Sequence, residues 1–212
     1  MGCCAFGCLT LLIIGFLFVA GVIGTAWYVY HKLATTELIS DRPAEVRLEP
    51  PTDAEFAAAE SALARLKTRT GREETVAFTA TDLNALVARD RDFRDLEKKV
   101  RIDIQDSVMT TTLSAPLDSL FWDGKGRRWF NGTLRLRGSY AAPEFDVELE
   151  SISGGDYEVP YFVLSQINSW INWALNDNRN HWDDGDFDSE VWKRIKSIRL
   201  EGDKMLVTTK AE

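Results

Sequence analysis

The chain of 212 residues is long enough for one membrane segment and one domain of ordinary size. Its 33 acidic and 25 basic side chains give a net charge of −8, which disfavours binding to nucleic acid or to anionic lipid through a basic surface. All three cysteines (Cys3, Cys4 and Cys8) lie in the first eight residues, so the later chain has no disulfide, no thiolate nucleophile and no cysteine-ligated metal.

The first predicted element is a transmembrane helix over Ala5–Tyr30. Residues 1–30 contain no charged side chain, and a helix of that length spans about 39 Å, enough to cross a bilayer with some tilt. Trp27, Tyr28 and Tyr30 at one end are typical of a membrane interface. A cleaved signal peptide is the alternative, but its apolar region would be shorter and preceded by Lys or Arg.

The membrane segment divides the chain into three predicted parts. Residues 1–32 form the anchor, 33–51 an irregular tether interrupted by prolines, and 52–212 one globular domain. The cysteines before the apolar run are either small apolar residues at the membrane boundary or sites of acylation. Charge flanking the helix is too sparse to fix the orientation, and taken alone it weakly favours a cytoplasmic domain.

Two helices are predicted at the start of the domain. Thr52 and Glu55 form a capping box, and the helix that follows, which is predicted to end near Gly71, has one apolar stripe. That stripe consists of Phe56, Ala59, Leu63 and Leu66. After a short strand over 75–78, Thr79 caps a second helix with Asp82 three residues on.

The remaining chain is predicted to be mostly strands. Alternating apolar residues indicate strands over 100–105, 108–116, 129–140 and 145–149, and a final hairpin turning at 201–204. A helix over 160–175 has an inward face of Val163, Leu164, Ile167, Ile171 and Ala174. The predicted fold class is therefore α+β: an N-terminal transmembrane helix, then a long, curved, mostly antiparallel sheet packed with two or three amphipathic helices.

Few residues indicate catalysis or metal binding. The acidic stretch 177–190 could supply oxygen ligands, but its spacing fails the calcium-loop pattern around Gly185, so a solvated loop is the expectation. His181 has no second histidine or cysteine for a zinc site, and no nucleophile elbow or phosphate loop is present. We therefore predict no enzyme, no cofactor and no metal.

The tryptophans are the candidate binding residues. Trp170 lies at the edge of the buried stripe of the 160–175 helix, Trp173 points with its polar face, and Trp122 and Trp129 fall in or beside loops. Exposed aromatic rings beside apolar strands are suited to an acyl chain or a bilayer surface, the alternative being that they close the ends of the core.

The order of elements resembles a known family. The segment FTATDLNALV, with Thr79, Leu83, Asn84 and Leu86 in a T-x-x-x-L-N-x-L pattern, is followed by a hairpin, the strand NGTLRLRGSY, a helix and a final hairpin. Behind a membrane anchor, this order over residues 75–210 resembles small bacterial membrane-anchored proteins of the YpmS type and, more loosely, the lipid-binding TULIP-like domains. The resemblance implies an extracytoplasmic domain that binds an amphiphile in an apolar trough.

These observations predict a single-pass protein of the cell membrane whose extracytoplasmic domain binds a lipid or another envelope amphiphile. The alternatives are a structural partner in an envelope protein assembly and, third, a carboxylate-dependent hydrolase. The expected partners are thus the membrane, an amphiphile or an envelope protein, and not nucleic acid.

Overall fold

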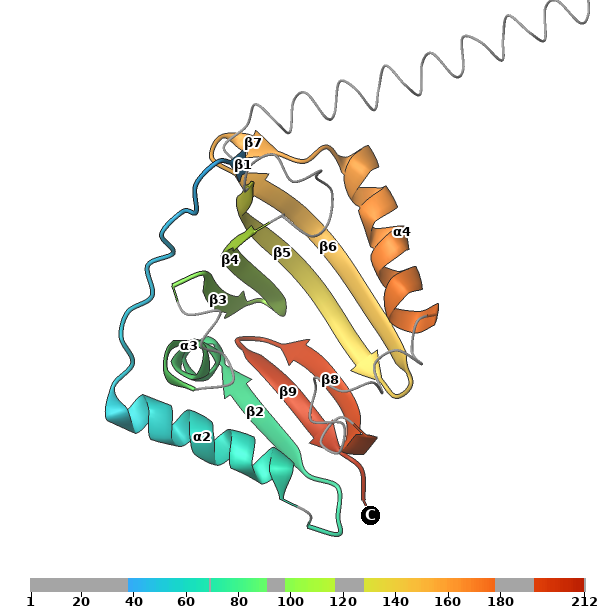
Figure 1. The fold of residues 1–212 in the computed structure, drawn as a ribbon. Coiled ribbons are helices and arrows are strands. Elements are labelled where there is room, and N and C mark those ends of the chain that lie inside the picture. Colours follow the sequence, from blue (N-terminus) through green and yellow to red (C-terminus); the bar gives the residue numbers. More distant parts are fainter. Residues whose placement is uncertain (1–37, 69, 91–97, 117–127, 178–192, 212) are drawn as a thin grey trace, which may run out of the picture.

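The computed structural model describes residues 38–68, 70–90, 98–116, 128–177 and 193–211, and these form an α+β domain (Figure 1). Three helices and nine strands lie in these ranges. In chain order the elements are β1 (Ile39–Ser40), α2 (Asp53–Lys67), β2 (Thr75–Thr79), α3 (Ala80–Arg89), β3 (Val100–Gln105), β4 (Val108–Pro116), β5 (Trp129–Ala141), β6 (Glu144–Gly154), β7 (Tyr157–Glu158), α4 (Tyr161–Asp177), β8 (Ile195–Glu201) and β9 (Lys204–Thr209). The predicted α+β class is confirmed for this part of the chain, whereas the predicted anchor, residues 1–32, lies outside it.

The sheet is organised around the long strand β5, and every strand pair in the described residues is antiparallel. One edge of β5 pairs first with β4 and then, from Ser139, with β8. The other edge pairs with β1 and β6. The turn between β3 and β4 contacts the turn between β8 and β9, because the Ser107 N–H donates a hydrogen bond to the Gly202 carbonyl at 2.8 Å. The result is one curved sheet with the order β2-β9-β8-β5-β4-β3, in which β6 pairs with the other edge of β5 (Figure 1).

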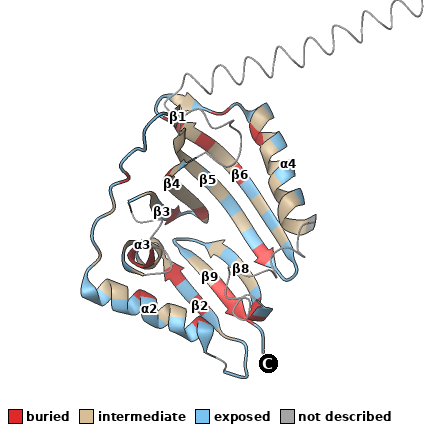
Figure 2. Cartoon of the chain, in the orientation of Figure 1, coloured by how far each residue is buried: buried red, intermediate tan, exposed pale blue. Residues whose placement is uncertain are grey.

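The first hydrophobic cluster lies under α2 and α3. The predicted stripe of α2 is confirmed, since Ala59 and Leu66 are buried and Phe56 and Leu63 pack against the same cluster. Both predicted capping boxes are present, and hydrogen bonds from the Thr52 N–H and side chain hold the pKa of the Glu55 carboxyl below its usual value. These helices pack against β2, and Figure 2 shows buried residues on β2 and on β9, the strand that pairs with it.

The second cluster lies between α4 and strands β5 and β6. Leu164 is buried, and Val163, Ile167 and Ile171 pack against the cluster, which confirms the inward face predicted for this helix. Each end of α4 lies within two residues of the predicted 160–175, and the short strand β7 that precedes it pairs with the end of β6. Strand β5 joins the two clusters, since Leu134 packs in this one and Tyr140 in the first.

Helix α4 is fastened to the outer edge of β6 by a row of asparagines. Asn168, Asn172 and Asn176 each accept a hydrogen bond from one strand N–H and donate to the carbonyl of the same strand residue. Those strand residues are Leu149, Val147 and Phe145. The spacing fits because four helical residues rise about 6 Å and two strand residues about 6.8 Å. The row therefore satisfies backbone groups that an uncovered edge strand would expose.

A single asparagine does the same at the opposite edge of the sheet. The Ile102 N–H donates to Asn84 Oδ1 at 2.8 Å, and Asn84 Nδ2 donates to the Ile102 carbonyl at 2.7 Å. Asn84 belongs to the T-x-x-x-L-N-x-L segment of α3, so this pattern has a structural role: it fixes α3 to the edge strand β3.

The segment that precedes α2 packs on the sheet. It is irregular apart from β1, as its prolines predict, but Leu38 and Val46 are buried. Leu38 lies over two glycines, since a Cβ on Gly132 or on Gly154 would come within 2.8 Å of its side chain. The Ala44 N–H donates to Asn131 Oδ1 at 2.9 Å. The chain is thus held in a defined position where it enters the domain.

Candidate functional site

The structure places the predicted binding tryptophans on different elements. Trp129 opens β5 and is half-buried, opposite Ser40 of β1 and Pro116 of β4. Trp170 and Trp173 project from α4 and are 62% and 58% exposed, so Trp170 lies outside the buried stripe at whose edge it was predicted. Trp122 lies outside the described residues.

Helix α4 has an outward aromatic face made by Phe162, Trp170 and Trp173. Their spacing of eight and eleven residues from Phe162 puts them on one side of the helix, and Phe162 is 55% exposed. Tyr161, the first residue of the helix, is 83% exposed. No charged residue occurs from Tyr161 to Asn176. An uncharged helix face with several exposed aromatic side chains, on an acidic domain, is the kind of surface that contacts another molecule.

The aromatic face is not needed to hold the helix in place. The asparagine row fixes one side of α4 to β6, and Leu164, Ile167 and their neighbours fix a second side to the core. The aromatic residues occupy the third side. They are therefore presented on a rigid element whose other two sides account for its stability.

The first turn of α4 lies close to the point where the chain enters the domain. Leu38, the first described residue, belongs to the same hydrophobic cluster as Val159 and Leu164. Tyr161 and Phe162 stand between these two in the sequence. The exposed aromatic residues at the start of α4 are thus close to Leu38, where the described chain begins.

A separate open hollow of about 690 Å³ lies between residues 42–47 and strands β3, β4 and β5. None of the three described tryptophans lines it. The charged residues of its wall are Arg42, Arg47 and Arg101, with one carboxylate, Glu45. We refer to it as the arginine groove. Sequence reasoning missed it, because Arg101 and Arg47 come together only when the segment before α2 packs on the sheet.

The described residues offer little for metal binding or acid–base catalysis. They contain no group of three or more His, Cys, Asp or Glu side chains arranged to hold a metal ion. The acidic stretch 177–190, with His181, lies outside them apart from Asp177. The lowered pKa of Glu55 comes from its capping box and marks a helix start, not a cleft.

None of the helices that the structure describes is both long and apolar enough to cross a membrane. No known protein family, curated protein or solved structure matches the chain. The fold and its surfaces therefore define only a class: an α+β domain on a curved antiparallel sheet, with an uncharged aromatic helix face and a groove lined by arginines.

Proposed function

We propose that this chain is a single-pass membrane protein whose extracytoplasmic domain binds a lipid or another amphiphile of the cell envelope, without catalysis. The observation that carries the proposal is the aromatic face of α4. Phe162, Trp170 and Trp173 are more than half exposed on a helix that has no charge for sixteen residues.

The chemistry of that face suits lipid. Tryptophan and tyrosine combine a large apolar ring with a polar N–H or O–H, which favours the boundary between acyl chains and water. Elsewhere the domain is acidic and would be repelled by anionic headgroups. The outer side of α4 can approach apolar material without the cost of removing water from a charged side chain.

The position of the face also fits a membrane anchor. If Ala5–Tyr30 spans the bilayer, seven residues separate Tyr30 from Leu38, and the eight steps from one Cα to the next reach at most about 28 Å. Leu38 packs in the same cluster as Leu164 of α4. The first turn of α4, with Tyr161 and Phe162, is then held close to the membrane surface.

The proposal is tested with the full-length chain in phosphatidylcholine vesicles, with and without bromine on the acyl chains. Bromine quenches tryptophan emission at short range, so the signal of Trp170 and Trp173 is obtained as the difference between wild type and the variant Trp170→Phe/Trp173→Phe. We expect brominated lipid to reduce that difference signal at least twofold. Trp129→Phe is the matched control, since its ring is half-buried in the sheet.

An unchanged difference signal would contradict lipid contact and favour the second candidate, a partner in an envelope protein assembly. The same aromatic face supports that candidate, because Trp and Tyr are enriched among the residues that dominate protein interfaces. A photo-crosslinking residue in place of Gln166, which is exposed on the same side of α4, would then capture a specific protein in native membranes.

A further inference from the structure

We propose that the arginine groove is a binding site for a phosphate group, either on a lipid headgroup or on a soluble molecule. This inference concerns a different surface from the aromatic face of α4 and a different chemistry. It therefore stands or falls separately from the proposed function.

The charge of the groove is opposite to that of the whole protein. Three arginines and one glutamate line it, which is 3 − 1 = +2, on a chain with a net charge of −8. The nearby Asp41 does not neutralise these arginines, because its carboxylate pairs with Arg128 at 3.3 Å. A local excess of positive charge on an acidic surface attracts an anion to this place and away from the rest of the domain.

The guanidinium groups of the groove have no carboxylate partner among the described residues. Other arginines of the same sheet do: Arg135 and Arg137 both pair with Glu150. Arg42, Arg47 and Arg101 are exposed, and all three are among the residues that line the open hollow. A guanidinium group binds the oxygens of a phosphate in pairs, so three of them around one hollow favour phosphate over a singly charged carboxylate.

The walls of the groove are held in position before any ligand binds. Between Arg42 and Arg47, the Ala44 N–H is held by Asn131 and the Val46 N–H donates to the Lys98 carbonyl at 3.3 Å. Arg101 comes from the opposite wall, on β3, whose backbone is fixed by Asn84. Binding therefore orders only side chains, which reduces the entropy lost on association.

The floor of the groove leaves room for a tetrahedral group. Thr112 and Thr133 contribute hydroxyl groups to its lining, and these two oxygens lie 3.2 Å apart. The volume of about 690 Å³ is ample for a phosphate and part of the molecule that carries it. Ser40, two residues after Leu38, also lines the groove. One end of the groove is therefore close to the start of the described chain.

The test is a calorimetric titration of the full-length chain in uncharged detergent. One arm uses inorganic phosphate, and the other uses mixed micelles containing phosphatidic acid, with phosphatidylcholine micelles as blank. Wild type should bind at least one probe, and Arg47→Gln/Arg101→Gln should bind it at least tenfold more weakly. Binding of phosphate alone identifies a soluble ligand, and binding of phosphatidic acid only identifies a lipid headgroup.

The matched control is Arg199→Gln/Lys204→Gln, which removes the same charge from exposed positions on β8 and β9. It should bind like wild type. If both double variants weaken binding equally, the effect comes from net charge alone and the proposed site is wrong. The site is also wrong if wild type binds neither phosphate nor phosphatidic acid. Arg47→Lys/Arg101→Lys, which keeps the charge, guards against a folding defect and should bind with intermediate affinity. The tryptophan quenching experiment is independent of these side chains, so the two proposals fail separately.

Discussion

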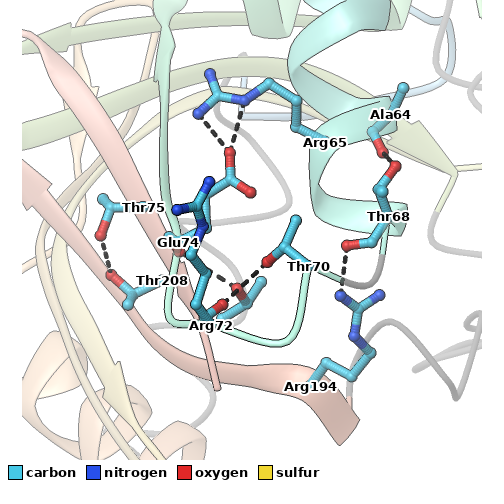
Figure 3. A network of polar contacts seen from close by, with 10 residues as sticks. Ala64, Arg65, Thr68, Thr70, Arg72, Glu74, Thr75, Arg194 and Thr208 are labelled. Carbon is cyan, nitrogen blue, oxygen red and sulfur yellow. Dashed lines mark hydrogen bonds and ion pairs between the residues drawn. The ribbon is translucent and has the colours of Figure 1, made fainter. Parts of the chain in front are cut away.

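Arg194 shows how one side chain joins distant parts of this domain. It lies just before β8, is only 7% exposed, and donates hydrogen bonds to the carbonyls of Leu66, Lys67 and Thr68 at 3.3, 3.1 and 2.7 Å. Figure 3 shows the bond to Thr68. Carbonyl groups at the end of a helix lack partners within the helix and carry partial negative charge. The guanidinium therefore caps α2 from a segment more than a hundred residues away in the chain.

We predict that Arg194→Met lowers the free energy of unfolding by about 2–4 kcal/mol, because buried carbonyls lose charged donors while the aliphatic volume is nearly kept. Urea denaturation of the full-length chain in uncharged detergent measures the change. Arg199→Met, at an exposed position on β8, should cost less than about 0.5 kcal/mol. Equal effects of the two substitutions would show that the cap contributes nothing.

At the scale of elements, the asparagine row of α4 shows how a helix is joined to the edge of a strand. The Val147 N–H donates to Asn172 Oδ1 at 3.0 Å, and Asn172 Nδ2 donates to the Val147 carbonyl at 2.6 Å. Asn172 sits in the middle of the row and is partly buried. A leucine of similar volume could fill the space but could not replace either bond.

Asn172→Leu should therefore destabilise the domain by about 1–3 kcal/mol and speed hydrogen exchange of the β6 amides, since it leaves a strand donor and acceptor unsatisfied. Gln166→Leu is the matched control on the exposed side of the same helix and should leave that exchange unchanged. Protection of β6 that persists in Asn172→Leu would mean that apolar packing alone holds α4 in place.

The regular elements could be predicted from the sequence because their signals are local. The alternation of Phe130, Leu134 and Leu136 gives a strand face, and Thr52 with Glu55 gives a helix start, without knowledge of any distant residue. The functions of the polar residues depend on partners far along the chain. As polar helix residues, Asn84 and Asn172 would be expected to face solvent. Nothing near them in the sequence identifies β3 or β6 as the strand whose edge they bind.

The candidate sites divide in the same way. The helix period places Trp173 on the polar face, where the structure has it, whereas Trp170, predicted at the edge of the buried stripe, is 62% exposed. The arginine groove was not predicted, because its arginines belong to an irregular segment and to β3, and they meet only through tertiary packing. Strands β1 and β7 were missed because two-residue strands are too short to show alternation.

At the scale of the whole molecule, the two surfaces share one end of the domain. Leu38, the first described residue, packs over Gly132 and Gly154, and both Ser40 of the groove and the first turn of α4 lie near it. A domain joined to a bilayer through that point would bring the first turn of α4 and the Ser40 end of the arginine groove close to lipid. Both proposals therefore depend on which side of the membrane the domain occupies.

The membrane side can be measured with one cysteine, because the domain has none of its own. We replace Cys3, Cys4 and Cys8 by Ser and introduce Asp203→Cys in the exposed turn between β8 and β9. The positive φ of this turn falls on Gly202, so the new cysteine does not have to adopt it. If the domain is extracytoplasmic, a membrane-impermeant maleimide should label intact cells as fully as lysed ones, and alkaline carbonate should leave the protein in the membrane fraction. Labelling only after lysis would place the domain in the cytoplasm, and release by carbonate would contradict a spanning helix at Ala5–Tyr30.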